Sequence, residues 1–258
     1  MNAIMIQNLK KNYGSFEVSL PRLDLRQGYV TGLVGKNGSG KTTLIRGICS
    51  RIPSSGTCRL AGETPGNAKA LAQTVSMIPQ RTSILFSIPV LDVVLMGLNS
   101  RLSLLAQPSA AQRQAARDLL RQVGMDGREE QDFLTLSEGQ KQLVILARAL
   151  MQDTPVLLLD EPDSALDLAN RSHMAALLAE FVHASGKTAL ICLHDPMLML
   201  DWCDTLIVLQ NGQVGAMLYP RTDPVEALQS ALAAVYGPLE LVPVTDRTGR
   251  VRLALLPL

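Results

Sequence analysis

Aromatic side chains are scarce in this chain of 258 residues, where Phe, Trp and Tyr together make up 3%. The core must therefore be built from leucine, valine, isoleucine, alanine and methionine. An excess of charge is also missing, since 24 basic residues face 23 acidic ones and the formal net charge is +1. Without a basic surplus or a Lys/Arg cluster among aromatics, nucleic-acid binding is not expected. The length suits one domain, or one domain with an inserted subdomain.

Long hydrophobic runs are missing as well, and none approaches the ~20 residues that a membrane-spanning helix needs. The longest candidates, residues 90–98 and 143–151, are short and interrupted by a charged residue. The first residues, MNAIMIQNLKK, lack the basic-then-apolar order of a secretory signal. We therefore expect a cytosolic protein, whose rather apolar surface can still meet a membrane protein.

The sequence offers no cluster of metal ligands. The three histidines are scattered, and His173 and His183 fall in a predicted helix, where we expect structural roles. The four cysteines show no C-x-x-C spacing and are expected to be reduced and structural: Cys49, Cys58, Cys192 and Cys203.

Strand-like and helical segments alternate along the chain, and several strands are apolar throughout. This pattern predicts an α/β fold with a mainly parallel sheet covered on both faces. Asn211-Gly212 predicts a hairpin, so one edge of the sheet turns antiparallel. The predicted strands are residues 3–9, 18–25, 29–35, 57–62, 74–79, 155–160, 188–194 and 205–210.

A helical segment separates the two strand-rich parts. Residues 108–124 carry a capping-box pattern, Ser109 with Gln112, and Gly124 closes the helix. A second helix is predicted from about Glu138 to Met151. The segment as a whole reads as a helical subdomain inserted into an α/β core.

Residues 35–42, GKNGSGKT, match the pattern G-x-x-x-x-G-K-[ST] between a predicted strand and a predicted helix. Glycines let backbone N–H groups curl around a phosphate, and the helix N-terminus adds partial positive charge. Lys41 can reach the β- and γ-phosphates, and Thr42 offers a hydroxyl to Mg²⁺. The alternative is a glycine-rich turn that matches by accident, and the strand and helix context argues against it. The predicted nucleotide-binding residues are Gly35, Lys36, Asn37, Gly38, Ser39, Gly40, Lys41, Thr42 and Thr43.

Two carboxylates follow the apolar strand in PVLLLDEP, residues 155–162. The strand can deliver Asp160 beside the phosphate loop, where it holds the water shell of Mg²⁺. Glu161 then stands where a general base can polarise an attacking water. Acidic residues also end many buried strands for structural reasons, but the pairing with a phosphate loop favours the catalytic role.

His194 follows the apolar run TALICL in the same way, at the strand end where ligands bind in such sheets. The functional interpretation is a hydrogen bond to the γ-phosphate. The alternative is a histidine that packs or faces solvent.

Taken in order, these motifs resemble those of the ATP-binding cassette ATPases over nearly the whole chain. Tyr13 in KNYG matches the aromatic residue that stacks on adenine, although a lone tyrosine near a strand more often packs. The order is the phosphate loop, Gln80 at the end of a strand, LSEGQ at 136–140, the acidic pair at 160–161, SALD at 164–167, and His194.

The resemblance implies a P-loop ATPase core with an antiparallel β edge and an inserted helical subdomain. Residues 1–258 would then form one cassette domain, in which residues 1–83 and 154–218 are the ATP-binding core. Residues 84–153 would be the helical subdomain with the signature motif, and residues 219–258 a C-terminal extension.

The resemblance also implies ATP hydrolysis with ATP and Mg²⁺, in a homodimer whose copies bind head to tail. The implied catalytic residues are Glu161, His194, Gln80 and Lys41, and the implied Mg²⁺ ligands are Thr42, Gln80 and Asp160. The signature residues that would cover the partner's ATP are Leu136, Ser137, Glu138, Gly139 and Gln140. The implied dimer-interface loop is Ser164, Ala165, Leu166 and Asp167.

The signature helix departs from the family at one position. Ser137 is a predicted N-cap, and Gln140 completes a capping box. Glu138 stands where the family usually has glycine, and it complements the helix dipole if its carboxylate points to solvent. A second departure is Asp163, where the family commonly has threonine, which adds negative charge close to Glu161.

The sequence around and between these motifs resembles one branch of the family, the cassettes that energise importers of iron–siderophore, haem, vitamin B12 or molybdate. Residues 87–125, 137–171 and 223–258 carry this resemblance. It implies integral-membrane permease subunits as partners, and indirectly an external substrate-binding protein. Residues 80–96 would form a groove for a cytoplasmic helix of the permease, or simply core. The location implied is peripheral, at the cytoplasmic face of the inner membrane.

Other classes stay open at this point. One is an exporter or lipid-pathway cassette, and another is a soluble cassette that remodels a complex, as in iron–sulfur assembly. A single phosphate loop and the lack of a heptad run disfavour the second class. The signature and Glu161 disfavour a free-standing small-molecule kinase. The sequence does not identify the cargo, because cargo contacts the permease and the external binding protein.

Overall fold

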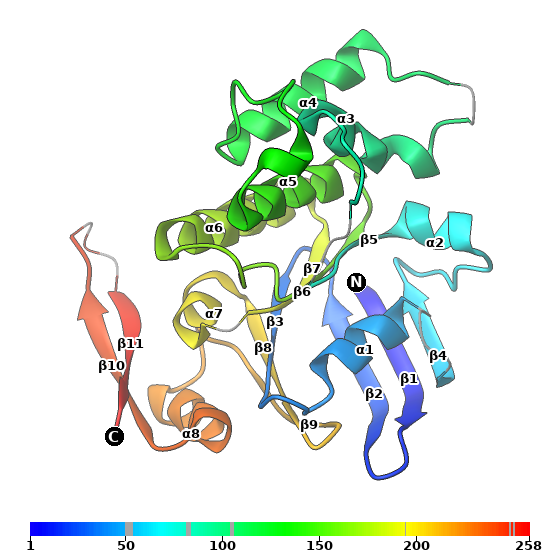
Figure 1. Cartoon of the computed structure of the whole chain (residues 1–258). Helices are drawn as coiled ribbons and strands as arrows, with labels where there is room; N and C mark the ends of the chain where they lie inside the picture. Colours follow the sequence, from blue (N-terminus) through cyan, green and yellow to red (C-terminus); the bar gives the residue numbers. More distant parts are fainter. Residues whose placement is uncertain (50–53, 81–83, 104–105, 194, 248, 250) are drawn as a thin grey trace.

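A sheet forms the centre of the molecule, as seen in the computed structural model (Figure 1). It has six strands. The structure describes residues 1–49, 54–80, 84–103, 106–193, 195–247, 249 and 251–258. The strand order is β5-β6-β7-β3-β8-β9, in which only β9 runs antiparallel to its neighbour. The bounds are β3 Val30–Val34, β5 Val75–Ile78, β6 Val156–Asp160, β7 Thr188–Cys192, β8 Thr205–Gln210 and β9 Gln213–Leu218.

Both faces of this sheet are covered, which confirms the sequence-based prediction. Successive side chains of a strand point to opposite faces. In β6, Leu157 and Leu159 belong to one buried cluster, whereas Val156 and Leu158 belong to another. Two cores therefore lie back to back across the sheet, and this explains why its central strands are apolar throughout.

An antiparallel sheet of three strands flanks one of these cores. Its order is β2-β1-β4, with β1 Asn2–Asn12, β2 Glu17–Arg26 and β4 Ser55–Leu60. Helix α1, Lys41–Ile48, contributes Leu44 and Ile45 to the cluster that also contains Ile6 of β1 and Leu190 of β7. α1 is thereby fixed between the two sheets. The short helix α2, Ala68–Thr74, was not predicted, and it has no buried residue to give it a helical pattern.

The region between β5 and β6 contains helices joined by loops, and no strand, in the residues that the structure describes. Both predicted capping boxes are present, with Ser109 and Ser137 as N-caps. These caps satisfy backbone N–H groups that the first turn of a helix leaves unpaired. The elements are α3 Val90–Leu95, η1 Met96–Ser100, α4 Ala110–Gln122, η2 Phe133–Thr135 and α5 Glu138–Met151.

Two helices in the last part of the chain contact the central sheet, and the final hairpin forms a separate sheet of two strands. Asn211 (φ 47°) and Gly212 (φ 77°) form the predicted turn between β8 and β9. The final hairpin packs on α7, and Arg252 donates a hydrogen bond of 2.7 Å to Asp201 of that helix. The elements are α6 Leu168–Ser185, α7 Pro196–Trp202, α8 Val225–Tyr236, β10 Leu239–Thr245 and β11 Val251–Pro257. In the described ranges, no helix combines the length and apolarity needed to span a bilayer.

Candidate nucleotide-binding site

The phosphate loop connects β3 to α1 at the carboxyl end of the parallel strands. Gly38 (φ 80°) and Gly40 (φ 105°) have left-handed backbone conformations that suit glycine. A Cβ at Gly35 would lie 2.4 Å from Ser39 Oγ and 2.5 Å from the Leu209 carbonyl oxygen. The loop therefore needs its glycines for backbone shape and for close packing. This is the arrangement that leaves backbone N–H groups free to bind an anion.

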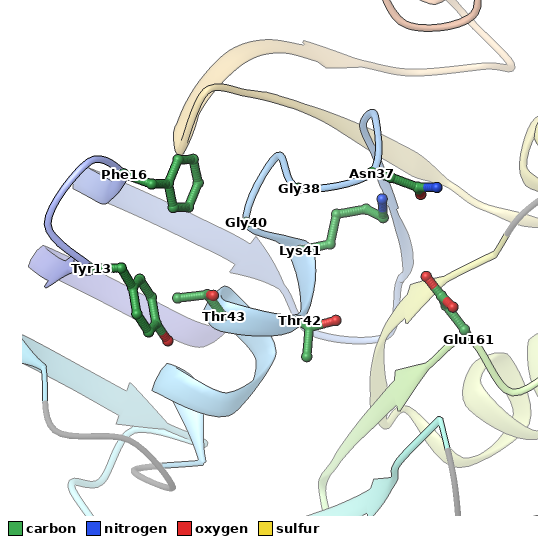
Figure 2. Close-up of a pocket in the computed structure, with 9 residues that line it drawn as sticks. All are labelled: Tyr13, Phe16, Asn37, Gly38, Gly40, Lys41, Thr42, Thr43 and Glu161. Atoms are coloured by element: carbon green, nitrogen blue, oxygen red, sulfur yellow. The ribbon is translucent and has the colours of Figure 1, made fainter.

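Lys41 folds back over the loop from the first position of α1. Its Nζ donates hydrogen bonds of 2.7 Å to the Gly35 carbonyl and 3.2 Å to the Lys36 carbonyl. Figure 2 shows its side chain extending into the pocket. An ammonium group held there can bind phosphate oxygens.

Thr42 and Asp160 bring the phosphate loop and the end of β6 together. The Thr42 hydroxyl donates a hydrogen bond of 3.2 Å to Asp160 Oδ1. Burial raises the pKa of the Asp160 carboxyl, the charge of Glu161 adds to the rise, and the bond from Thr42 opposes it. A buried carboxylate with a raised pKa gains from a nearby cation. The pair of oxygens thus fits a hard divalent cation such as Mg²⁺.

Glu161 comes directly after β6 and has an unusual backbone. Its φ of 53° is in the left-handed region, which is sparsely populated by residues other than glycine. Its backbone N–H donates a hydrogen bond of 3.2 Å to the Cys192 carbonyl. The amide of Gln80, which follows β5, donates a hydrogen bond to the Glu161 carboxylate. The structure therefore brings Gln80 and Glu161 together from two separate strands.

Lys41, Thr42 and Glu161 line a single cavity of about 410 Å³. Tyr13, which is 50% exposed, stands at one side, and Lys41 and Glu161 lie toward the other (Figure 2). The cavity is lined by Tyr13, Phe16, Asn37, Gly38, Gly40, Lys41, Thr42, Thr43 and Glu161.

Phe16 is the lining residue that the sequence analysis missed. It lies between β1 and β2, and a Cβ at Gly40 would be 3.3 Å from its Cζ. The sequence did contain a signal for Phe16. The chain has only four phenylalanines, and this one lies three residues after Tyr13, the predicted adenine-stacking residue.

The signature residues lie outside this cavity, at the start of α5. Ser137 Oγ accepts from the Gln140 N–H at 3.3 Å, and the Gln140 side chain accepts from the Ser137 N–H at 3.1 Å. Glu138 has a side chain that is 76% exposed, and it forms a 2.7 Å ion pair with Lys141. Its carboxylate therefore points to solvent, as the sequence analysis required.

The predicted interface loop follows Glu161 and meets the signature residues. A Cβ at Gly139 would lie 3.0 Å from the Ala165 carbonyl oxygen, so the two segments are in close contact. Asp163 is fully buried, and Asp167 caps α6 by accepting from the Asn170 N–H at 2.8 Å. His194 lies outside the described residues. In the described part of the chain, no group of three or more His, Cys, Asp or Glu side chains could hold a metal ion.

A phosphate loop ahead of a helix, with an acidic pair ending another strand of the same parallel sheet, defines a P-loop nucleoside triphosphatase fold. The profile of the family described as ABC transporter matches residues 19–164. The chain belongs to this family, and its fold is that of an ABC ATPase cassette.

Named relatives and solved structures agree with this membership. The cobalamin import ATP-binding protein BtuD of Halobacterium salinarum is 32% identical over 87% of this chain and 59% of its own length. The manganese transport system ATP-binding protein MntB of Bacillus subtilis is 36% identical over 74% of this chain and 76% of its own length. A solved structure described as a metal-chelate type ABC transporter in an inward-facing conformation superposes with a TM-score of 0.84. It is 26% identical and covers 100% of this chain and 98% of its own. The chain thus spans about three fifths of the length of the cobalamin relative.

Proposed function

We propose that this chain is the ATP-hydrolysing subunit of an importer for a metal chelate or a related cargo. One observation carries the catalytic part of the proposal. Glu161, bonded to Gln80, lines the same cavity as Lys41 and Thr42, and Thr42 is bonded to Asp160. A general base and a phosphate-binding ammonium in one cavity, with a pair of cation ligands of which Thr42 lines it, are the parts that hydrolysis of a nucleoside triphosphate requires.

The roles follow from position. Tyr13 stacks on adenine, and the loop N–H groups with Lys41 hold the phosphates. Thr42, Asp160 and Gln80 would hold Mg²⁺, which would neutralise phosphate charge when bound. Glu161 accepts a proton from the attacking water, and Gln80 orients its carboxylate. His194 contacts the γ-phosphate in this proposal. The phosphate-binding residues are Gly35, Lys36, Asn37, Gly38, Ser39, Gly40, Lys41, Thr42 and Thr43.

Two copies work together in this proposal. The signature residues 136–140 lie outside the cavity of their own chain, at a capped helix N-terminus with partial positive charge. That charge favours the phosphate of a nucleotide, so a second copy can bring the helix to the first copy's ATP. ATP closes the homodimer, and hydrolysis reopens it.

A groove on the helical region, lined by apolar side chains together with Asp92, Asn99 and Ser103, supports a permease partner. A cavity of about 530 Å³ is lined by residues between Ile88 and Pro108, including Leu95, Met96 and Leu102. Phe86, which precedes it, is 57% exposed. A helix of a membrane subunit fits such a groove through its apolar anchors. The chain would thereby be peripheral at the cytoplasmic face of the inner membrane.

The cargo is proposed only as a class. The relatives are named for cobalamin and manganese, and the solved structure for a metal chelate. Siderophore-bound iron, haem, cobalamin and molybdate are the members of this class that the sequence resemblance suggested. An exporter or lipid-pathway cassette, or a soluble cassette of the iron–sulfur assembly type, is the alternative.

Affinity purification of the tagged chain from detergent-solubilised membranes tests the proposal. The expected result is a stoichiometric polytopic membrane protein, identified by mass spectrometry, whose own sequence points to the cargo. Recovery from the soluble fraction alone, with soluble partners or none, would contradict the transport role and leave the ATP site to be tested by hydrolysis.

A further inference from the structure

The loop between the catalytic strand β6 and helix α6 is exposed at its middle and buried on either side. Ser164 and Ala165 are exposed, whereas Leu166 is only 4% exposed. The loop begins at Glu161 and consists of short turns, in which the Ser164 N–H donates to the Glu161 carbonyl and the Leu166 N–H to the Asp163 carbonyl. A shift at Leu166 is therefore passed back through these turns to the backbone of Glu161.

Arg171 fixes this loop from the first turns of α6. Its Nε donates a hydrogen bond of 2.8 Å to the Leu166 carbonyl oxygen, while its own N–H bonds to the Asp167 carbonyl. The side chain is half-buried and does not line the nucleotide cavity. A hydrogen bond from a charged donor is stronger than one between neutral groups, so Arg171 is a firm anchor for the loop.

The anchored loop also touches the signature helix of the same chain. An added Cβ at Gly139 would be 3.0 Å from the Ala165 carbonyl oxygen and 3.6 Å from Leu166 Cδ2. Packed backbone contacts this tight transmit small displacements. The position of Leu166 thus sets the base at one end of the loop and supports the tip of α5 at the other.

We propose that Arg171 is a positioning residue for hydrolysis, which acts through the Leu166 carbonyl to hold Glu161 and the signature helix in one fixed relation. It contacts no substrate. This inference rests on the proposed function, because it takes Glu161 as the general base. Arg171 then matters for the chemical step and not for nucleotide binding.

Steady-state ATPase kinetics of the purified chain test this role. We expect Arg171→Gln to lower kcat about tenfold or more and to change KM by less than about twofold, because misplacing a base by a fraction of an ångström slows the reaction without weakening binding. Arg171→Lys keeps a charged donor and should restore part of the loss. Arg101→Gln is the matched control, since it breaks another arginine-to-carbonyl bond, from Arg101 to Asp153, outside the cavity. We expect the control to leave kcat and KM near wild type.

Several outcomes would overturn the inference. One is a normal kcat for Arg171→Gln when Glu161→Gln is inactive. This result would contradict the role of Arg171 and leave the proposed function standing. Normal hydrolysis by Glu161→Gln would remove the assignment of the base, and this inference with it. If Arg171→Gln does not fold, Arg171→Lys decides, with an expected loss of about threefold in kcat at constant KM. An unchanged kcat in the lysine variant, or parallel changes in kcat and KM, would then count against a positioning role.

Discussion

The hydroxyl of Thr42 donates a 3.2 Å hydrogen bond to the carboxylate of Asp160, and this bond joins two segments that lie 118 residues apart in the chain. It links the first turn of α1 to the end of β6. Because Asp160 is also buried, its ionised carboxylate lowers the stability of the nucleotide-free protein.

Replacing Asp160 by Asn should stabilise the nucleotide-free protein at pH 7. The pKa of Asp160 is raised, chiefly by burial, so the folded state binds a proton more readily than the unfolded state. The ionised carboxylate therefore lowers the free energy of unfolding as pH rises from the ordinary carboxyl pKa through the raised one. The gain from Asp160→Asn should be present above this window and vanish below it.

Urea unfolding between pH 4 and 7 measures this difference. Asp126→Asn is the control, because the Asp126 side chain is 64% exposed and should show no such trend. The same Asp160→Asn protein should lose about 10²-fold or more of its Mg²⁺-dependent ATPase activity, since a cation ligand is gone. A variant that is less stable than wild type at pH 7 would show that the buried carboxylate is already compensated.

Glu161→Gln should bind ATP and almost stop hydrolysing it. Removing a general base costs typically 10²–10⁴-fold in rate, while the amide keeps the shape of the carboxylate and its contact with Gln80. With ATP bound and not consumed, the dimer should accumulate, which light scattering with ATP and Mg²⁺ detects. Glu180→Gln, on the exposed face of α6, is the matched control. A Glu161→Gln protein that stays monomeric under these conditions would mean that the base is assigned to the wrong residue.

Glu138→Gly should keep ATPase activity within about tenfold of wild type, because an exposed ion pair is worth roughly 0–1 kcal/mol. The carboxylate points to solvent and pairs with Lys141, so it makes no contact in the nucleotide cavity of its own chain. Lys141→Met breaks the same pair from the other side and should have a similar effect. A loss larger than tenfold for Glu138→Gly alone would assign the carboxylate a specific role at the partner's site.

Phe16→Ala should weaken ATP binding by about tenfold, since base–aromatic contacts contribute roughly 1–3 kcal/mol. Phe16 lines the nucleotide cavity beside Tyr13, so Tyr13→Ala should act similarly. Fluorescence titration with a labelled nucleotide measures both, and kcat at saturating ATP should stay near wild type. Tyr219→Ala, at an exposed aromatic outside the cavity, controls for loss of stability. Unchanged affinity in Phe16→Ala would show that the base stacks on Tyr13 alone.

The cysteines should react slowly with thiol reagents in the folded protein. Burial raises the pKa of Cys58 to about 12 and also raises the pKa of Cys192 and of Cys203, while Cys49 is shielded because it is only 4% exposed. The reactive thiolate is therefore rare at pH 8. Ellman's reagent should label none of the four thiols rapidly and all four in denaturant. Fast labelling of a single thiol in the native protein would reveal a more open site than this structure has.

The sequence by itself determined the class of the fold and most of the cavity. Apolar strands such as residues 156–159 require cover on both faces of a sheet, and Gly38 and Gly40 of the phosphate loop have positive φ. Both capping boxes were also readable, because a cap depends only on residues three positions apart. These features are local or periodic, so a linear pattern contains them.

Tertiary structure decided the contacts between segments distant in the chain. The bond from Gln80 to Glu161 depends on β5 and β6 being neighbours, and strand order is not encoded in the period of either strand. Phe16 enters the cavity only because the antiparallel sheet brings the turn between β1 and β2 beside the phosphate loop. Local pattern specifies which residues can do chemistry, whereas packing between elements decides which of them meet.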